Sequence, residues 1–131
     1  MGQRKSFEVE GYGHGANPIP AVARIGSFIA SGGISGRSLA NGKLAESLDG
    51  QCKLMFELMK IIAETAGVTT DEILKVTIYL RSGLSRDPIN QQWVQYFPEL
   101  ENCPVRHVLI NDNLPDKMLV QCEFMAVAPS G

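Results

Sequence analysis

The segment Cys103–Pro129, CPVRHVLINDNLPDKMLVQCEFMAVAP, reads as two strands joined by a loop rich in Asn, Asp and Pro. Along the second strand, one face is entirely apolar and suited to lie against helices: Met118, Val120, Cys122, Phe124 and Ala126. The opposite face is too apolar to contact only water: Leu119, Gln121, Glu123, Met125 and Val127. We therefore expect further copies of the chain to cover this face in a symmetric homo-oligomer.

Three other segments have the composition of strands. Lys5–Val9 is a short candidate, and residues 21–31, AVARIGSFIAS, predict two short strands or one bulged strand interrupted at Gly26 and Ser27. In residues 73–81, ILKVTIYLR, apolar and polar residues alternate, which indicates a strand with one buried face.

Two helices are expected between the strands. The first has an apolar face repeating at spacings of three and four: Leu48, Cys52, Met55, Met59 and Ile62. Ser47 is its expected N-cap and Gly67 its end, whereas the second helix starts with Asp87 as cap and Pro88 as first residue and ends near Pro98. Helices that alternate singly with strands predict an α+β sandwich with both helices on one face of the sheet.

Composition limits the functional classes. The 131 residues, 44% hydrophobic, are expected to form a single domain covering residues 1–131. Twelve basic and fourteen acidic residues give a formal charge of −2, and the sequence has no basic stripe. We therefore do not expect nucleic acid as the main partner.

Cysteine and histidine content points to a cytoplasmic protein without metal or cofactor. Cys52, Cys103 and Cys122 form no CxxC pair and are odd in number, as in proteins of reducing compartments. With only His14 and His107, the chain lacks a metal-ligand pattern, and it has neither a phosphate-binding loop nor a nucleophile elbow. No apolar run reaches the roughly 18 residues that would predict a membrane span.

Arg106 is the residue that calls for a functional explanation, because a guanidinium among apolar residues needs an anionic partner. If residues 104–111 and 117–127 pair as an antiparallel hairpin, Arg106 lies close to Gln121 and Glu123. The partner is then either Glu123, in a structural ion pair, or the anionic group of a ligand. The neighbouring His107 is expected to face the opposite side of the strand.

Gly32 and Gly33 follow directly after the strand that ends at Ser31. Two interpretations are open, namely a tight turn, or a place where a ligand approaches the backbone closely.

Several of these segments together resemble the RidA/YjgF family, the reactive-intermediate deaminases once called L-PSP endoribonucleases. The resemblance lies in PVRHVLI, LVQCEFMAVA, FIASGGI, the helix ending in ETAG, VTIYL, and the run N-x-x-W-x-x-x-FP that begins at Asn90. It implies a chorismate-mutase-like α+β fold with a mixed sheet, and a homotrimer with a site in each cleft between subunits. It also implies hydrolysis of imines and enamines of small amino acids, such as 2-aminoacrylate, to a keto acid and ammonia.

The resemblance assigns roles to individual residues. Arg106 matches the arginine that holds the substrate carboxylate through paired charge-assisted hydrogen bonds. Ser31, Gly32 and Gly33 match the strand end whose backbone lies beside the ligand, and Asn90 matches a position near the cleft.

Other positions depart from the family pattern. Gln121 stands where active members have the glutamate that holds the attacking water, and Glu123 matches a second acidic position on the same strand face. Ile19 stands in place of a tyrosine and Val108 in place of a cysteine. Tyr12 and His14, from the same loop as Ile19, are candidates to replace that tyrosine.

The sequence therefore predicts a cytoplasmic homotrimer that binds small 2-imino and 2-keto acids and hydrolyses reactive imines, with Arg106, Gln121 and Glu123 as the catalytic group. Because glutamine cannot act as a base, a ligand-binding trimer without catalysis is the first alternative. An endoribonuclease that inhibits translation is the second, and the net charge argues against it.

Overall fold

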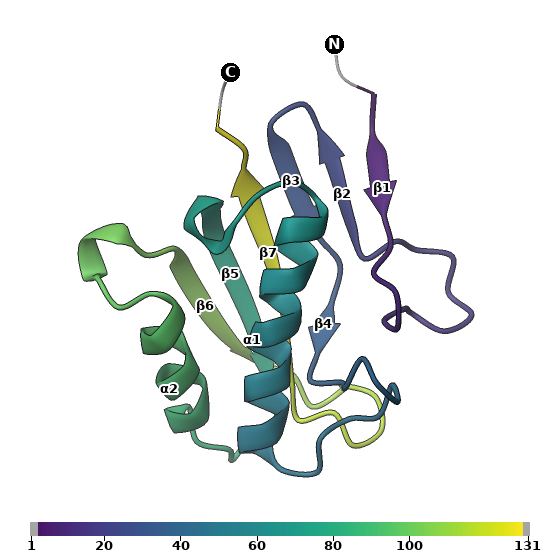
Figure 1. Cartoon of the computed structure of the whole chain (residues 1–131). Helices are drawn as coiled ribbons and strands as arrows, with labels where there is room; N and C mark the ends of the chain where they lie inside the picture. The colour runs from purple at the N-terminus through teal and green to yellow at the C-terminus, as the bar shows by residue number, and fades with distance from the viewer. Residues whose placement is uncertain (1–2, 130–131) are drawn as a thin grey trace.

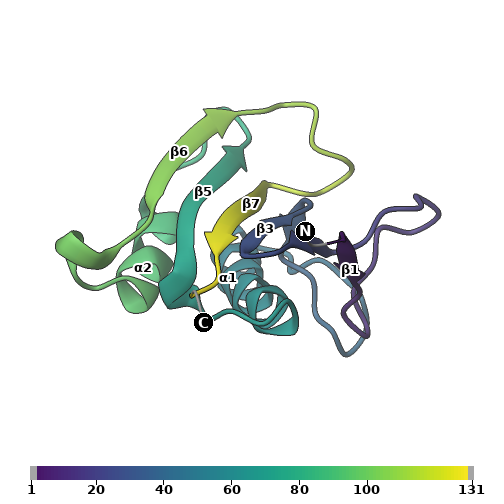
Figure 2. The ribbon, with the colours of Figure 1, turned by 90° about the horizontal axis from the view of Figure 1, so that it is seen from above.

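The computed structural model describes residues 3–129, in which seven strands form one sheet with two helices on the same face (Figures 1 and 2). The strands are β1 (Lys5–Phe7), β2 (Val22–Ile25), β3 (Phe28–Ser31), β4 (Ile34–Ser35), β5 (Ile73–Leu80), β6 (Val105–Ile110) and β7 (Val120–Val127). The helices are α1 (Leu48–Thr65) and α2 (Asp87–Tyr96), and short 3-10 turns occur at Thr70–Glu72 and Leu100–Asn102. This is the expected α+β class with a mixed sheet.

Strand β7 lies at the centre of the sheet, whose order is β1-β2-β3-β7-β5-β6, and β4 pairs with β7 outside that path. β7 runs antiparallel to both β3 and β5, while β5 and β6 are parallel. The expected hairpin of the last two strands is therefore wrong, because β5 lies between them. Because α2 connects β5 to β6, β6 lies parallel to β5 along the outer edge of β5. β7 pairs with the inner edge of β5.

The predicted interruption at Gly26 and Ser27 is confirmed as the turn between two short strands, β2 and β3. The short β4 was missed, because its two residues follow a Gly-Gly pair and carry no alternation of their own.

The ends of α1 also follow the prediction. The Ser47 side chain caps the helix by accepting a hydrogen bond from the Gly50 N–H, and Gly67 follows the last turn with a φ of 93°. At α2 the expected Asp87 cap is wrong: the cap position is Arg86, which makes no side-chain cap bond, and Asp87 is already the first helical residue.

The core lies between α1 and the sheet. Phe124 and Cys122 of β7, with Ile78 of β5, lie among the fully buried residues, as do Met55 and Met59 of α1. The apolar face predicted for the last strand is thus buried from Met118 to Ala126.

The other face of the sheet carries no helix (Figure 2). Its exposed side chains are largely apolar: Ile25, Phe28, Leu74, Val105, Leu109, Met125 and Val127. Phe28 is 70% exposed and Met125 is 55% exposed. We call these seven residues the open face. Its covering by further copies of the chain remains a prediction.

Gly36 and Gln51 join the start of α1 to the segment that leads into β7. The buried Gln51 amide donates to the carbonyl oxygens of Ala45 and Lys117, and accepts from the Leu119 N–H at 2.9 Å. A Cβ added at Gly36 would overlap with the Gln51 backbone. This close approach requires glycine at position 36.

We expect Gly36→Ala to lower the free energy of unfolding by about 3 kcal/mol, because the new methyl group forces two backbones apart. Urea denaturation at one fixed protein concentration measures the change. Gly13→Ala is the control: an added Cβ meets nothing within 4 Å there, so we expect a change below about 1 kcal/mol. Equal losses in both variants would contradict the packing account.

Candidate functional site

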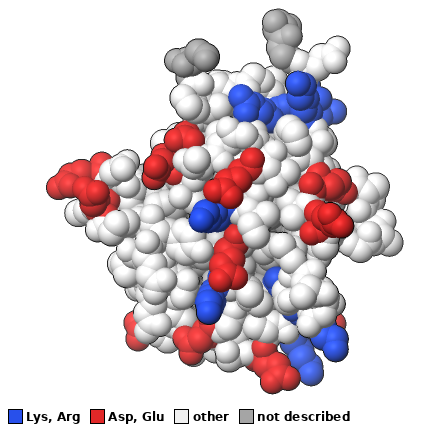
Figure 3. Space-filling model, viewed as in Figure 1, with Lys and Arg blue, Asp and Glu red and all other residues white. Residues whose placement is uncertain are grey.

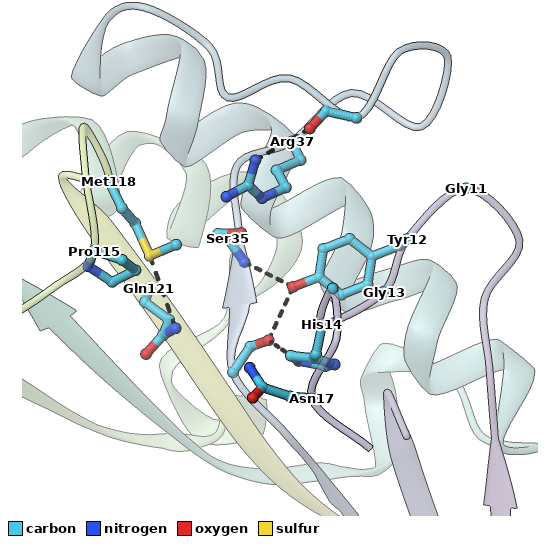
Figure 4. Close-up of a pocket in the computed structure, with 13 residues that line it drawn as sticks. Gly11, Tyr12, Gly13, His14, Asn17, Ser35, Arg37, Pro115, Met118 and Gln121 are labelled. Atoms are coloured by element: carbon cyan, nitrogen blue, oxygen red, sulfur yellow. Dashed lines mark hydrogen bonds between the residues drawn. The ribbon is translucent and has the colours of Figure 1, made fainter. Parts of the chain in front are cut away.

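A cavity of about 650 Å³ lies where the N-terminal loop, β4 and the start of β7 meet (Figure 4). Its lining comes from segments far apart in the sequence: Gly11, Tyr12, Gly13, His14, Gly15, Asn17, Gly33, Ser35, Arg37, Gly42, Pro115, Met118 and Gln121. Four residues singled out from the sequence, Tyr12, His14, Gly33 and Gln121, meet there. We call it the β4–β7 cavity.

Tyr12 and His14 fix the N-terminal loop onto β4. The Tyr12 hydroxyl donates to the Gly33 carbonyl oxygen at 2.9 Å and accepts from the Ser35 N–H at 3.2 Å. Burial raises the pKa of Tyr12, so the phenol stays protonated and keeps its role as donor. The His14 Nε2 lies 3.2 Å from the same Gly33 oxygen, and the two rings meet edge to face with centroids 5.7 Å apart.

These contacts also define the tautomer of His14. Because the partner of Nε2 is a carbonyl oxygen, Nε2 must carry the proton and donate it. In the neutral ring Nδ1 is then an acceptor, and it is buried without a hydrogen-bond partner among residues 3–129. Tyr12 and His14, the two candidates to replace the family tyrosine, both lie in the cavity wall. Ile19 is half exposed and lies outside the cavity lining.

Gln121 lies against Gly33. A Cβ added at Gly33 would be only 2.7 Å from the Gln121 Nε2, so the missing side chain makes room for the amide. The amide makes a long hydrogen bond, from Nε2 to the Met118 Sδ at 3.8 Å. A sulfur is a weak acceptor, so the Gln121 amide remains available to a ligand or a water molecule.

Arg37 contributes a cation to the cavity, and the sequence analysis missed it. Its Nη1 donates to the Gly42 carbonyl oxygen at 3.1 Å, and Figure 4 shows the side chain reaching toward the space between Met118 and Tyr12. In the sequence, the feature that could have indicated Arg37 is its position four residues after Gly33, in the same glycine-rich stretch.

Arg106 lies on the opposite side of the sheet from Gln121. It pairs in register with the buried Val76, and its guanidinium carbon lies 5.0 Å from the centre of the Trp93 ring of α2. Burial, and the nearby charge of Arg86, lower the pKa of Arg106. The expected meeting of Arg106 with Gln121 and Glu123 inside one chain is therefore wrong.

The alternative ion pair between Arg106 and Glu123 is wrong for the same reason. Glu123 accepts a hydrogen bond from the Tyr79 hydroxyl at 2.9 Å on the open side of the sheet, and this bond raises the pKa of Tyr79. Glu123 and Gln121 do share a strand face, as predicted, but Glu123 lies outside the lining of the β4–β7 cavity. His107 faces away from Arg106, as expected, since it pairs in register with Thr77 next to Glu123.

The remaining predicted residues lie around the cavity or near Arg106. The Ser31 hydroxyl donates to the Gly32 carbonyl oxygen and accepts from the Phe124 N–H, so it links β3 to β7. Gly32 lies beside the His14 ring. Asn90 is exposed on α2, one turn before Trp93, and Val108 is half-buried at the edge of the core, on the Arg106 side of β6.

Arg81, a further residue that the sequence analysis missed, holds the loop that supplies Pro115 and Met118. Its guanidinium donates to the carbonyl oxygens of Asp112, Leu114, Asp116 and Met118. This arginine therefore acts structurally on the cavity wall.

In the described part of the chain, no three His, Cys, Asp or Glu side chains cluster as metal ligands would. Within the same range, no helix is long and apolar enough to cross a membrane.

Comparisons with known proteins agree with this architecture. A "RutC family protein" of Aquifex aeolicus is 28% identical over 110 residues, covering 84% of this chain and 88% of the relative. The "2-iminobutanoate/2-iminopropanoate deaminase" of Salmonella typhimurium is 23% identical over 124 residues, covering 94% and 97%. The crystal structure of Escherichia coli TdcF with bound serine has a TM-score of 0.85 at 23% identity and covers 95% and 99%, which shows a shared fold.

The family model described as "Endoribonuclease L-PSP" matches residues 16–128, nearly the whole chain. The chain therefore belongs to the RidA/YjgF family, also described as the L-PSP family.

Proposed function

We propose that this protein is a homotrimer that binds small 2-imino and 2-keto acids and hydrolyses reactive imine and enamine acids to keto acids and ammonia. One observation carries the proposal: the β4–β7 cavity presents the Gln121 amide beside Gly33 and the Tyr12–His14 pair, at a sheet whose open face is apolar. The family resemblance implies this combination, namely a site for a small polar ligand next to a surface suited to self-association.

The separation of Arg106 from Gln121 supports a site between subunits. Within one chain the sheet lies between the two side chains, so they cannot bind the same small acid. Arg106 lies on β6, at the edge of the sheet, where a neighbouring copy can approach it. In the proposed trimer, Arg106 of one subunit faces the β4–β7 cavity of the next.

The comparisons support the substrate class. The Salmonella typhimurium relative is named for the deamination of 2-iminobutanoate and 2-iminopropanoate, and the TdcF structure holds serine, a small amino acid. Both ligand types carry one carboxylate next to a carbon that bears nitrogen. Arg106 is the residue of this chain that we propose to bind that carboxylate, through two parallel hydrogen bonds.

The reaction needs little from the protein. In R–C(=NH)–COO⁻ + H₂O → R–C(=O)–COO⁻ + NH₃, water adds to the imine carbon and the C–N bond then breaks. Positioning the imine and one water molecule supplies most of the acceleration. The Gln121 carboxamide oxygen can accept a hydrogen bond from that water, although it cannot take its proton. The proton can go to the departing nitrogen, so no strong base is required.

Binding without catalysis is the second candidate, and Gln121 is the observation that favours it, because an amide is no base. Ribonuclease activity has no such support. Over the helix-covered face, Figure 3 shows acidic side chains interspersed with basic ones, and carboxylates repel an RNA backbone.

Light scattering should give three times the chain mass for the wild type at micromolar concentration. Phe28→Asp should dissociate the trimer, because it places a charge on the open face where Phe28 is 70% exposed in a single chain. Leu100→Asp is the matched control, since Leu100 is 89% exposed but lies in a turn before β6. A monomeric wild type, or a trimeric Phe28→Asp, would contradict assembly through the open face.

Arg106→Ala should weaken binding of 2-oxobutanoate by about 2 to 4 kcal/mol, the scale for losing a charge-assisted pair. The free energy of unfolding of this variant should fall by only about 1 kcal/mol. The reason is that, within its own chain, the Arg106 guanidinium makes a cation–π contact with the Trp93 ring, and such contacts have about this strength. Calorimetric titration and thermal unfolding measure the two effects, with Arg86→Ala, a neighbouring exposed arginine, as control. A large loss of stability combined with unchanged binding would make Arg106 structural.

Gln121→Glu should raise the rate of imine hydrolysis, because a carboxylate in the cavity can also accept a proton from water. Glu123→Gln tests the other candidate and should change the rate little, since Glu123 bonds to Tyr79 outside the cavity lining. The rate is measured as the decrease in semicarbazone formed from enzymatically generated 2-aminoacrylate. If Glu123→Gln abolishes turnover and Gln121→Glu has no effect, the roles are reversed.

A further inference from the structure

Arg37 is held in the wall of the β4–β7 cavity by a small hairpin that follows β4. Arg37 and Leu44 form an antiparallel bridge, and the Ser38 N–H donates to the Lys43 carbonyl oxygen at 2.9 Å. Gly42 closes the turn with a φ of 73°, and its carbonyl oxygen accepts from the Arg37 Nη1. The guanidinium is thus oriented by the backbone before any ligand binds.

This orientation leaves most of the guanidinium for a ligand. Arginine has five N–H donors, and within residues 3–129 the hydrogen bond of the Arg37 side chain is the one to Gly42. Figure 4 shows the guanidinium pointing toward the space between Met118 and Tyr12, with Gln121 next to Met118. An arginine fork of this kind matches the geometry of a carboxylate.

The charge of the cavity is positive. None of its thirteen lining residues is acidic, and Arg37 supplies its arginine. An adjoining cavity, which shares Arg37 and Gly42, has two lysines and two acidic residues in its lining and so adds no net charge apart from Arg37. An anionic group is therefore the favoured occupant of the space beside Arg37.

The cavity leaves room for a second anion. In a single chain its volume is about 650 Å³, which exceeds what a small monocarboxylic acid fills. In the proposed trimer, Arg106 of the neighbouring subunit already binds the carboxylate next to the reacting carbon. A substrate with a carboxylate at each end would contact both arginines.

We propose that Arg37 determines specificity by binding the distal carboxylate of the substrate, so that this protein prefers dicarboxylic 2-imino acids, the imines of acidic amino acids, over the imines of neutral ones. The inference rests on the function proposed above and names the substrate class of the same site. The reaction at the imine carbon is unchanged.

Calorimetric titration with 2-oxoglutarate and 2-oxobutanoate, which differ chiefly in the distal carboxylate, tests the preference directly. Wild type should bind 2-oxoglutarate about tenfold or more tightly than 2-oxobutanoate, the factor expected for one charge-assisted contact. Arg37→Gln should lose that preference, so that the two keto acids bind with similar affinities. Lys60→Gln, which removes the same charge from the exposed side of α1, should behave as wild type.

A turnover assay separates this inference from the proposed function. The imines of D-aspartate and D-alanine are generated by flavin amino-acid oxidases, and their trapping by semicarbazide is followed with and without the protein. Faster hydrolysis of the aspartate imine, lost in Arg37→Gln, supports both statements. If the neutral imine is hydrolysed but 2-oxoglutarate has no Arg37-dependent advantage, the role of Arg37 is overturned and the deaminase stands. Arg37-dependent binding of 2-oxoglutarate without hydrolysis of either imine supports the distal site and overturns the catalytic function. If neither keto acid binds and neither imine is hydrolysed, both proposals fail.

Discussion

The alternation of β7 is the constraint on which the rest of the structure depends. Val120, Cys122 and Phe124 are buried against the helices, so Gln121 and Glu123 must face the other side. A shift of one residue in its pairing would expose the core and bury the amide. The position of Gln121 in the β4–β7 cavity is thus a consequence of hydrophobic burial. The same alternation produces the open face that we propose for assembly.

The elements whose signals are local were predictable from the sequence. Ser47 and Gly67 define the ends of α1 through short-range hydrogen bonds and backbone conformation, and alternation in β5 identifies its buried face. Strand pairing was not predictable in this way, because it depends on contacts between distant segments. The hairpin expected for β6 and β7 placed Arg106 beside Glu123, whereas β5 separates the two strands.

The candidate site was predicted in part for similar reasons. The family resemblance pointed to Gly33 and Gln121, and the structure explains why they suit one another, since only glycine leaves room for the amide. Arg37 and Arg81 were missed because their directions follow from hydrogen bonds to carbonyl oxygens of neighbouring loops. Such bonds have no periodic pattern in a sequence. The three arginines have different environments: Arg81 is structural, Arg37 faces a cavity, and Arg106 stacks on Trp93 at the edge of the sheet.

The central claim is that one site is built from two chains, with Arg106 from one subunit and Gln121 from the next. Subunit mixing tests it most directly: Arg106→Ala and Gln121→Leu chains are unfolded, combined in equal amounts and refolded, and imine hydrolysis is measured. Each mixed trimer then contains one site with both native residues, so the account predicts recovery of about a quarter of the wild-type activity from two weakly active variants. A mixture no more active than the two variants refolded separately would contradict a shared site.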